Sequence, residues 1–205
     1  MFLRNVIRDS VVREYSILFL RFSPAVLSTA SLDSPPKGRV FAIIVCINRY
    51  KARDGLLNLN GCVNDGRQFE DFLTKKLRVP DSHICWRTDE NATYQEIMGL
   101  LKVASENLMA LFPKASDFQK GDLIVLFYAG HGGRSRLNAP PLWAEGHVTD
   151  DGAIELLCPH DIDAQAEDHT KIHGIPDFVF GNLLEAIANK NGGNVVRSSS
   201  SGRCP

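Results

Sequence analysis

The chain has 205 residues, which is long enough for one α/β domain with a sizeable core and too short for two. Hydrophobic residues make up 44% and charged residues 23%, both ordinary for a globular protein, and the formal net charge is -1. This near-neutral balance, without any basic stripe, gives no reason to expect nucleic acid or a membrane as a partner.

Residues 1–38 are predicted to be an N-terminal extension and linker. The first part carries several arginines and a short apolar run that Arg21 interrupts, so it suits neither a secretory signal nor a membrane span. An organellar presequence is an alternative, which Asp9 and Glu14 weaken. Residues 23–38 are rich in Ser and Pro, as linkers are.

The folded domain is predicted to span residues 39–196 and to alternate strands with helices. Short apolar runs rich in β-branched residues predict buried strands at 39–47, 83–88 and 122–129. Apolar residues at helical spacing predict three helices, which begin near Asn64, near Thr93 or Asn91, and near Pro176. This alternation predicts an α/β fold, with a mainly parallel sheet and helices on both faces. A small hairpin is predicted around 146–157.

The end of the sequence breaks this pattern. A fourth strand is predicted to open with NVV (194–196) and to fail directly after it. Residues 197–205 read RSSSSGRCP and are predicted to be a low-complexity tail. The strands that would follow are missing, so we expect an exposed sheet edge and a short core.

The five cysteines are an odd number without any CxxC spacing, and two of them lie in apolar runs. This usage predicts reduced, buried thiols in a cytoplasmic protein, and neither a disulfide framework nor a zinc cage. Cys158, His160 and Asp161 lie close together, but their spacing is too crowded for a zinc site and there is no second pair of ligands.

His131 lies among glycines in AGHGG, directly after the most apolar predicted strand. Catalytic groups gather at the carboxyl ends of parallel strands, so this position is a candidate for an active site. The glycines predict a sharp turn that leaves the imidazole uncovered, with the N–H of Gly132 beside the ring. The pattern alone also fits a loop histidine without chemistry, or a flavodoxin-like nucleotide binder with a phosphate-binding turn. A phosphate loop would be followed by a helix, which RSRLNAPPLW does not start.

Four motifs occur in one order at compatible spacing, and the set is more specific than any member. They are LNGCVNDGRQFEDFL (59–73), RTDENATYQEI (87–97), KGDLIVLFYAGHGG (120–133) and LLCPHD (156–161). Together they resemble the caspase-like cysteine peptidases, in particular the metacaspase branch and its fungal relatives, over about residues 39–196. The resemblance implies a caspase–haemoglobinase α/β fold and the hydrolysis of peptide bonds by a Cys/His dyad.

The resemblance also implies roles for three residues. His131 would polarise the attacking thiol or the scissile carbonyl and then protonate the leaving amine, and Gly132 would donate its N–H to the oxyanion. Asp65 matches the aspartate that metacaspases place in the pocket for the residue before the scissile bond. The implied substrate is therefore a protein or peptide cut after Arg or Lys. Alternatively, Asp65 caps the helix that follows it.

An acidic stretch contains Asp150, Asp151 and Glu155. Many metacaspases are activated by calcium through acidic residues in this general region, but the ligands cannot be matched here one by one. A solvated turn is the favoured interpretation, so we expect no cofactor and keep calcium activation as the alternative.

The nucleophile is the missing part of the resemblance. In the family, the strand after the last helix ends in a stretch of the type Asp-Cys-Cys-His-Ser-Gly, whose cysteine attacks the peptide. The matching positions here fall on the serines 198–201, and neither Cys158 nor Cys204 lies where the family places its nucleophile. We therefore expect a metacaspase-like endopeptidase domain that is inactive in this form, as a truncated or mis-spliced product or as a natural pseudo-enzyme. The alternative is a non-catalytic module that regulates a full-length relative by pairing through the open sheet edge.

Overall fold

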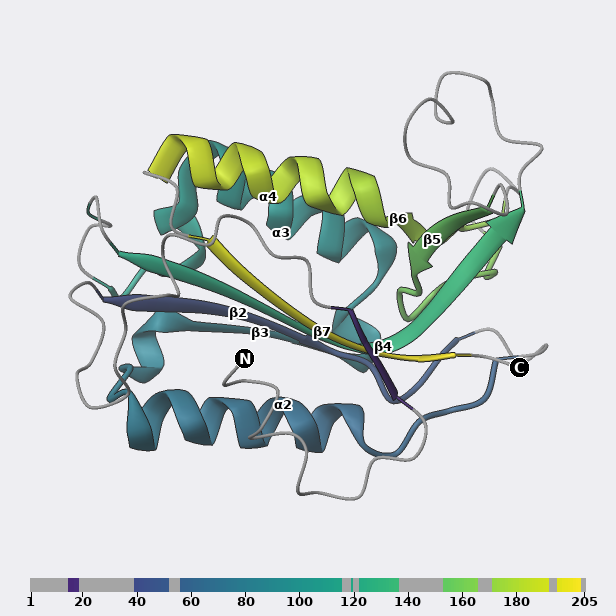
Figure 1. Ribbon diagram of the computed structural model, residues 1–205, viewed down its shortest axis with the longest axis horizontal. Coiled ribbons are helices and arrows are strands. Elements are labelled where there is room, and N and C mark those ends of the chain that lie inside the picture. The colour runs from purple at the N-terminus through teal and green to yellow at the C-terminus, as the bar shows by residue number, and fades with distance from the viewer. Residues whose placement is uncertain are drawn as a thin grey trace.

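A computed structural model describes residues 15–18, 39–51, 56–115, 119, 122–136, 153–165, 171–191 and 195–203. Their strands form one sheet with the order β1-β7-β4-β2-β3, in which β5 lies beside β4 and β6 beside β5 (Figure 1). The pairs β2–β3, β2–β4 and β4–β7 are parallel, and the other pairs are antiparallel. The strands are β1 Tyr15–Leu18, β2 Val40–Cys46, β3 Ile84–Thr88, β4 Leu123–Arg136, β5 Ala153–Leu157, β6 Ile175–Pro176 and β7 Val195–Arg203.

Helices cover both faces of the sheet, as the sequence predicts. Figure 1 shows α3 and α4 on one face and α2 on the other. Their bounds are α2 Cys62–Asp71, continued by the π-helical turn η1 Phe72–Lys76; α3 Tyr94–Asn107, followed by the 3-10 turn η4 Leu108–Leu111; and α4 Asp177–Asn191. Two short 3-10 turns, η2 Asp81–His83 and η3 Asp89–Asn91, flank β3. In the part of the chain described, no helix is long and apolar enough to cross a membrane.

β2 is apolar along its whole length because it lies between two hydrophobic cores, one on each face of the sheet. Successive side chains of a strand point to opposite faces. Phe41, Ile43 and Val45 therefore pack toward α3 and α4, whereas Ala42 and Ile44 pack toward α2. Because both faces are covered, every residue of β2 is buried, and the predicted buried strand is confirmed.

The predicted helix starts are close to the observed ones. The Thr93 side chain accepts a hydrogen bond from the N–H of Glu96 at 3.2 Å, so Thr93, and not Asn91, is the N-cap of α3. Of the predicted hairpin, residues 146–152 lie outside the described residues. The remainder forms β5, which pairs with β4 and β6.

The predicted end of the fourth strand at Val196 is wrong. β7 continues through the serine run to Arg203, and it pairs with β4 from Val195 to Arg203. Ladder hydrogen bonds are made by the backbone, so a run of serines can continue a strand that has neighbours on both sides.

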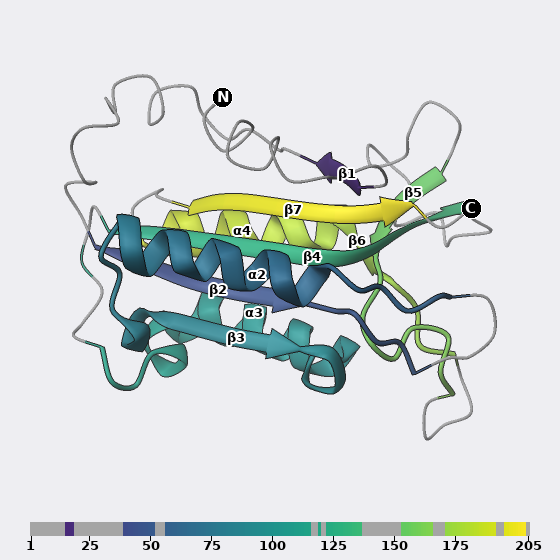
Figure 2. The same ribbon diagram turned by 90° about the horizontal axis from the view of Figure 1, so that it is seen from below.

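The predicted exposed edge at β7 is wrong only for the part of the strand that β1 covers. β1 comes from the predicted N-terminal extension and pairs antiparallel with β7, from Tyr15 opposite Gly202 to Leu18 opposite Ser199. Figure 2 shows β1 along the side of β7 that faces away from β4. The N-terminal segment therefore covers part of the edge that the sequence suggested was open.

Asp122 joins the starting ends of β2 and β4. Its carboxylate accepts hydrogen bonds from the backbone N–H of Arg39 and of Gln119, both at 2.8 Å, and pairs with the Arg39 guanidinium at 2.7 Å. Burial alone would raise the pKa of the Asp122 carboxyl, but these hydrogen bonds and the Arg39 charge outweigh burial and lower the pKa.

We expect Asp122→Asn to lower the free energy of unfolding by about 1–2 kcal/mol near neutral pH, since solvent partly screens Arg39. A depressed folded-state pKa means that the carboxylate stabilises the protein above its unfolded pKa, and that this contribution is lost as pH falls through the folded pKa. Urea unfolding of both proteins between about pH 7 and about pH 3 measures the difference, which should shrink in acid. A difference that stays constant with pH would exclude this charge effect.

Candidate active site

His131 lies inside β4 and not in a turn after it. β2 ends at Cys46, but β5 takes its place beside β4, with Leu157 opposite Gly132, so β4 continues past the histidine. The His131 side chain is only 4% exposed. The predictions of a sharp turn and an uncovered imidazole are therefore wrong. The GHGG stretch is part of a strand, so it does not itself open a helix as a phosphate-binding turn would.

Gly130 is needed for space and not for a turn. Its φ lies outside the left-handed region. A Cβ at this position would lie 2.7 Å from the hydroxyl oxygen of Tyr128 and 3.0 Å from that of Tyr50. The glycine before His131 thus leaves room for two buried tyrosine hydroxyls.

These hydroxyls hold the backbone of the histidine. The N–H of His131 donates to the Tyr50 hydroxyl at 2.7 Å, and the Tyr128 hydroxyl lies 3.1 Å from the His131 carbonyl oxygen and 2.9 Å from that of Cys158. Burial raises the pKa of both tyrosines well above the ordinary value, so they remain neutral hydroxyls.

The imidazole is oriented by a main-chain carbonyl. Its Nε2 lies 2.8 Å from the Leu57 carbonyl oxygen, which can only accept, so Nε2 carries a hydrogen. In the neutral ring Nδ1 then holds the lone pair. Among the buried side-chain nitrogens and oxygens of the described residues, His131 Nδ1 is the one without a hydrogen-bond partner. The site therefore holds an oriented imidazole whose Nδ1 has no hydrogen-bond partner among the described residues.

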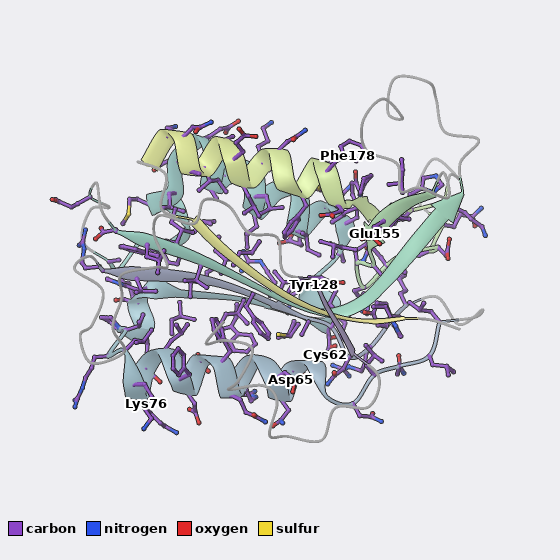
Figure 3. The ribbon with its side chains drawn as sticks, in the orientation of Figure 1. Cys62, Asp65, Lys76, Tyr128, Glu155 and Phe178 are labelled. Atoms are coloured by element: carbon purple, nitrogen blue, oxygen red, sulfur yellow. The ribbon has the colours of Figure 1, made fainter. Side chains whose placement is uncertain are left out.

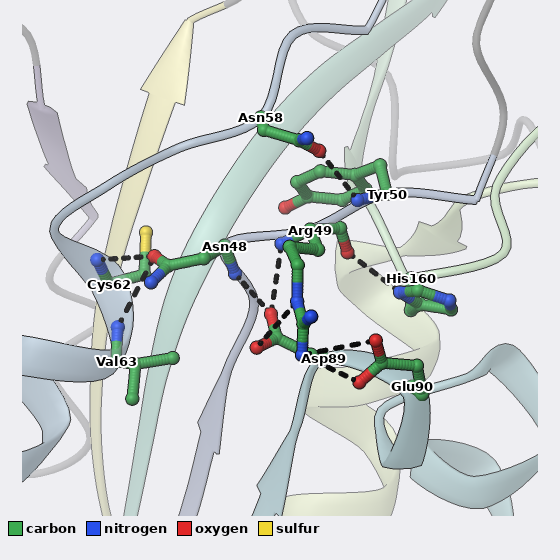
Figure 4. A network of polar contacts seen from close by, with 9 residues as sticks. All are labelled: Asn48, Arg49, Tyr50, Asn58, Cys62, Val63, Asp89, Glu90 and His160. Carbon is green, nitrogen blue, oxygen red and sulfur yellow. Dashed lines mark hydrogen bonds and ion pairs between the residues drawn. The ribbon is translucent and has the colours of Figure 1, made fainter.

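The segment that follows β2 makes a network of polar contacts with α2 and with Asp89 (Figure 4). Asn48 accepts hydrogen bonds from the N–H groups of Cys62 at 2.9 Å and Val63 at 3.4 Å, and thereby caps α2. The Asp89 carboxylate accepts from the N–H of Asn48 at 2.8 Å and from that of Arg49 at 2.9 Å. Asp89 has a φ of 44°, a left-handed conformation that a short polar side chain tolerates.

Sequence reasoning missed this segment, although a signal existed. INRY follows the first buried strand directly and so lies at the same end of the sheet as His131, where polar side chains are candidates for site residues.

Asp65 lies in the first turn of α2, but it does not cap the helix, because the helix begins at Cys62 and Asn48 supplies the cap. The prediction of a capping role is therefore wrong. The Asp65 side chain is half-buried and makes no ion pair with a described residue, and burial raises its pKa. Figure 3 shows Cys62 and Asp65 at the same end of α2. Strand alternation puts His131 on the face that carries Phe127 and Ala129, which pack toward α2.

Gly132 is placed within the sheet, with Leu157 opposite on one side and Arg203 on the other. Its backbone thus lies between two neighbouring strands and not at an open turn. β7 runs beside the histidine-bearing strand, with Ser198 opposite Phe127 and Ser201 opposite Gly130.

The described cysteines are free thiols, but those next to α2 are held as thiols and not thiolates. Burial raises the pKa of Cys46 strongly and that of Cys62 to about 12, with the Asp65 charge adding to both. Cys158 is buried, and its N–H donates to the His131 carbonyl oxygen at 3.0 Å. Cys204 lies outside the described residues.

The side chains of His160 and Asp161 make structural hydrogen bonds. His160 Nδ1 donates to the Arg49 carbonyl oxygen at 2.7 Å, and the Asp161 carboxylate accepts from the Tyr94 N–H at 2.7 Å. Glu155 lies on β5 opposite Arg134, whereas Asp150 and Asp151 lie outside the described residues. Within the described ranges, no three His, Cys, Asp or Glu residues gather into a group that could hold a metal ion.

Comparison with known families decides the assignment. The family model of the metacaspase peptidase C14 domain matches residues 41–175, well over half of the chain. The chain belongs to the metacaspase family. Its sheet with helices on both faces is the caspase-like fold of that family.

A solved structure agrees with the fold of this metacaspase domain. The crystal structure of protein GSU0716 from Geobacter sulfurreducens matches 78% of the chain at 16% identity, with a TM-score of 0.50. This chain covers 48% of that one, so it spans about half of its length. A search of curated proteins found no match.

Proposed function

We propose that this metacaspase chain carries the base-bearing part of a cysteine endopeptidase site that selects Arg or Lys before the scissile bond. The observation that carries the proposal is His131, whose Nε2 is held by the Leu57 carbonyl and whose buried Nδ1 has no partner among the described residues. A buried nitrogen with an unused lone pair is costly for stability, which supports a functional reason for it.

The chemistry follows from that nitrogen. A cysteine thiol beside Nδ1 would transfer its proton to the ring and attack the scissile carbonyl carbon as a thiolate. The imidazolium would then protonate the leaving amine as the C–N bond breaks. Gly132 is proposed as the oxyanion donor, a role that requires β7 to end before the level of Gly132 so that its N–H faces the substrate.

Asp65 supports the preference for basic residues. A half-buried carboxylate without a cationic partner has a raised pKa, because burial disfavours its charge. A guanidinium or ammonium from a substrate would supply the missing counter-charge, and a bidentate Arg–carboxylate pair is among the strongest hydrogen-bonded contacts. No comparable benefit would come from an acidic side chain.

We further propose that the chain as it stands is inactive, because β7 carries serines beside the histidine-bearing strand. A serine hydroxyl is a much weaker nucleophile than a cysteine thiol near neutral pH. The alternative, a regulatory module that pairs with a relative, would first have to displace β1 from the β7 edge.

The test is hydrolysis of reporter peptides that end in Arg or Lys by the full chain, with and without calcium. We expect no turnover above the level of the His131→Ala variant. Turnover that depends on His131 and on a serine between 198 and 201 would contradict inactivity and identify that serine as the nucleophile. Turnover that appears only with calcium would contradict inactivity and favour calcium activation through the acidic stretch at Asp150, Asp151 and Glu155.

A further inference from the structure

The contacts of Tyr50 connect the backbone of His131 to the carbonyl group that binds the imidazole of His131. The Tyr50 hydroxyl accepts from the His131 N–H at 2.7 Å, and the Tyr50 N–H donates to the Asn58 side chain at 3.0 Å. Asn58 is covalently joined to Leu57, whose carbonyl accepts from His131 Nε2 at 2.8 Å. Tyr50 thus anchors both the backbone of His131 and the loop 56–60, which contains the Leu57 carbonyl that binds the imidazole.

We propose that Tyr50 is a positioning residue that fixes the tautomer of His131 and so determines which nitrogen is free to act as the base. The role of His131 as a base rests on the proposed function. The effect on the tautomer does not, and it can be measured without any peptidase activity.

The hydroxyl of Tyr50 replaces a strand partner. Ile47, the residue after β2, donates its N–H to the Ala129 carbonyl of β4 at 2.8 Å, which is the last hydrogen bond on that side. The pairing of β4 with β5 begins at Gly132. His131 lies between these two ladders. Its N–H is buried, and the Tyr50 hydroxyl is the acceptor that satisfies it.

Backbone hydrogen bonds, and not side-chain packing, hold the Leu57 carbonyl in place. The Leu57 side chain is 74% exposed, so its packing contributes little to holding the Leu57 carbonyl in place. The position of that carbonyl depends on neighbouring hydrogen bonds, from the Tyr50 N–H to Asn58 and from the Leu59 N–H to the Asn48 carbonyl at 2.7 Å. The Tyr50 ring also packs on the imidazole, with ring centroids 4.9 Å apart.

The chemical consequence concerns the proton on the ring. A fixed carbonyl acceptor at Nε2 stabilises the tautomer with hydrogen on Nε2 and leaves the lone pair on Nδ1. If the loop or the backbone of His131 shifts, that preference weakens and the other tautomer becomes populated. The base would then point its lone pair toward the Leu57 carbonyl, where it cannot accept a thiol proton.

The experiment measures the tautomer of His131 by long-range ¹H–¹⁵N correlation in the labelled full chain, at a pH where the ring is neutral. The signals of His131 are those that disappear in His131→Gln. The variants are Tyr50→Phe, which removes the hydroxyl, and Asn58→Ala, which removes the acceptor for the Tyr50 N–H. Asn58→Asp keeps an acceptor oxygen at that place. Asn60→Ala, at another exposed position of the loop, is the control.

We expect a single Nε2–H tautomer in the wild type, in Asn58→Asp and in Asn60→Ala. Tyr50→Phe and Asn58→Ala should show a mixture in which the Nδ1–H form is clearly detected. An unchanged tautomer in folded Tyr50→Phe and in Asn58→Ala would overturn the proposal. So would an Asn58→Asp spectrum like that of Asn58→Ala. If Tyr50→Phe does not fold, the exposed Asn58 pair decides the outcome. A tautomer effect combined with failed peptidase repair would remove the proposed function and keep the positioning role.

Discussion

Replacing His131 with alanine is expected to abolish the activity of a repaired protein. In that protein, a relative's Asp-Cys-Cys-His-Ser-Gly stretch and the segments after it replace residues 197–205. The repaired protein should cut after Arg or Lys, because under the proposed function His131 supplies the base and Asp65 the pocket carboxylate. General acid–base catalysis contributes about 10²- to 10⁴-fold, so His131→Ala should lower kcat/KM by at least about that factor.

The measurement is kcat/KM on matched peptides that end in Arg, Lys, Asp or Leu. His173→Ala, at an exposed histidine, is the matched control and should leave the rate unchanged. Asp65→Ala should weaken the preference for Arg and Lys over Leu without removing turnover. Full activity of a folded His131→Ala protein would refute the role of this histidine, whereas a preference for Asp peptides would refute only the role of Asp65.

Replacing Gly130 with alanine is expected to destabilise the fold strongly, unlike the same change at Gly99 or Gly181. Gly130→Ala would bring Cβ within 2.7 Å of the Tyr128 hydroxyl and 3.0 Å of the Tyr50 hydroxyl, both buried. Overpacking costs about 1–3 kcal/mol, and a buried polar group that loses its hydrogen bond adds a similar cost. We expect a loss of about 2–4 kcal/mol in the free energy of unfolding, measured by urea denaturation.

Two other glycines serve as controls for this effect. Gly99 in α3 and Gly181 in α4 have no atom within 4 Å of an added Cβ, so alanine there should stabilise its helix by up to about 1 kcal/mol. If Gly130→Ala were as stable as these variants, the hydroxyls would not fill the space beside Gly130. In the double variant with Tyr50→Phe, the cost of the methyl group should become smaller, because one of the two clashing oxygens is gone.

The fold could be predicted largely from apolar patterning. β2 is a run of seven buried residues, and such a run fits only a strand covered on both faces. The start of α3 could be predicted to within two residues, since Thr93 and Asn91 were both candidate caps and the structure shows Thr93 in that role. In these elements the local sequence and the tertiary packing favour the same structure.

The site could not be predicted to the same degree, because it depends on contacts between distant segments. The glycines around His131 suggested a turn, but β5 pairs with β4 beyond the end of β2 and keeps the strand extended. The reason for Gly130 is the space that Tyr50 and Tyr128 occupy, which no spacing in the sequence reveals. The serines of β7 have no apolar pattern, and only the backbone pairing with its two neighbours makes them a strand.

The pairing of β1 with β7 has a consequence for the order of folding. Nearly the whole chain separates the two strands in sequence, and the entropy of closing a loop rises with its length. Strands β2, β3 and β4 are closer to one another in the chain and can form their ladders first. We therefore expect the β1–β7 ladder to assemble last and to open first from the native state. Its amide hydrogens should then exchange with solvent before those of the central strands, which hydrogen-exchange measurements can check.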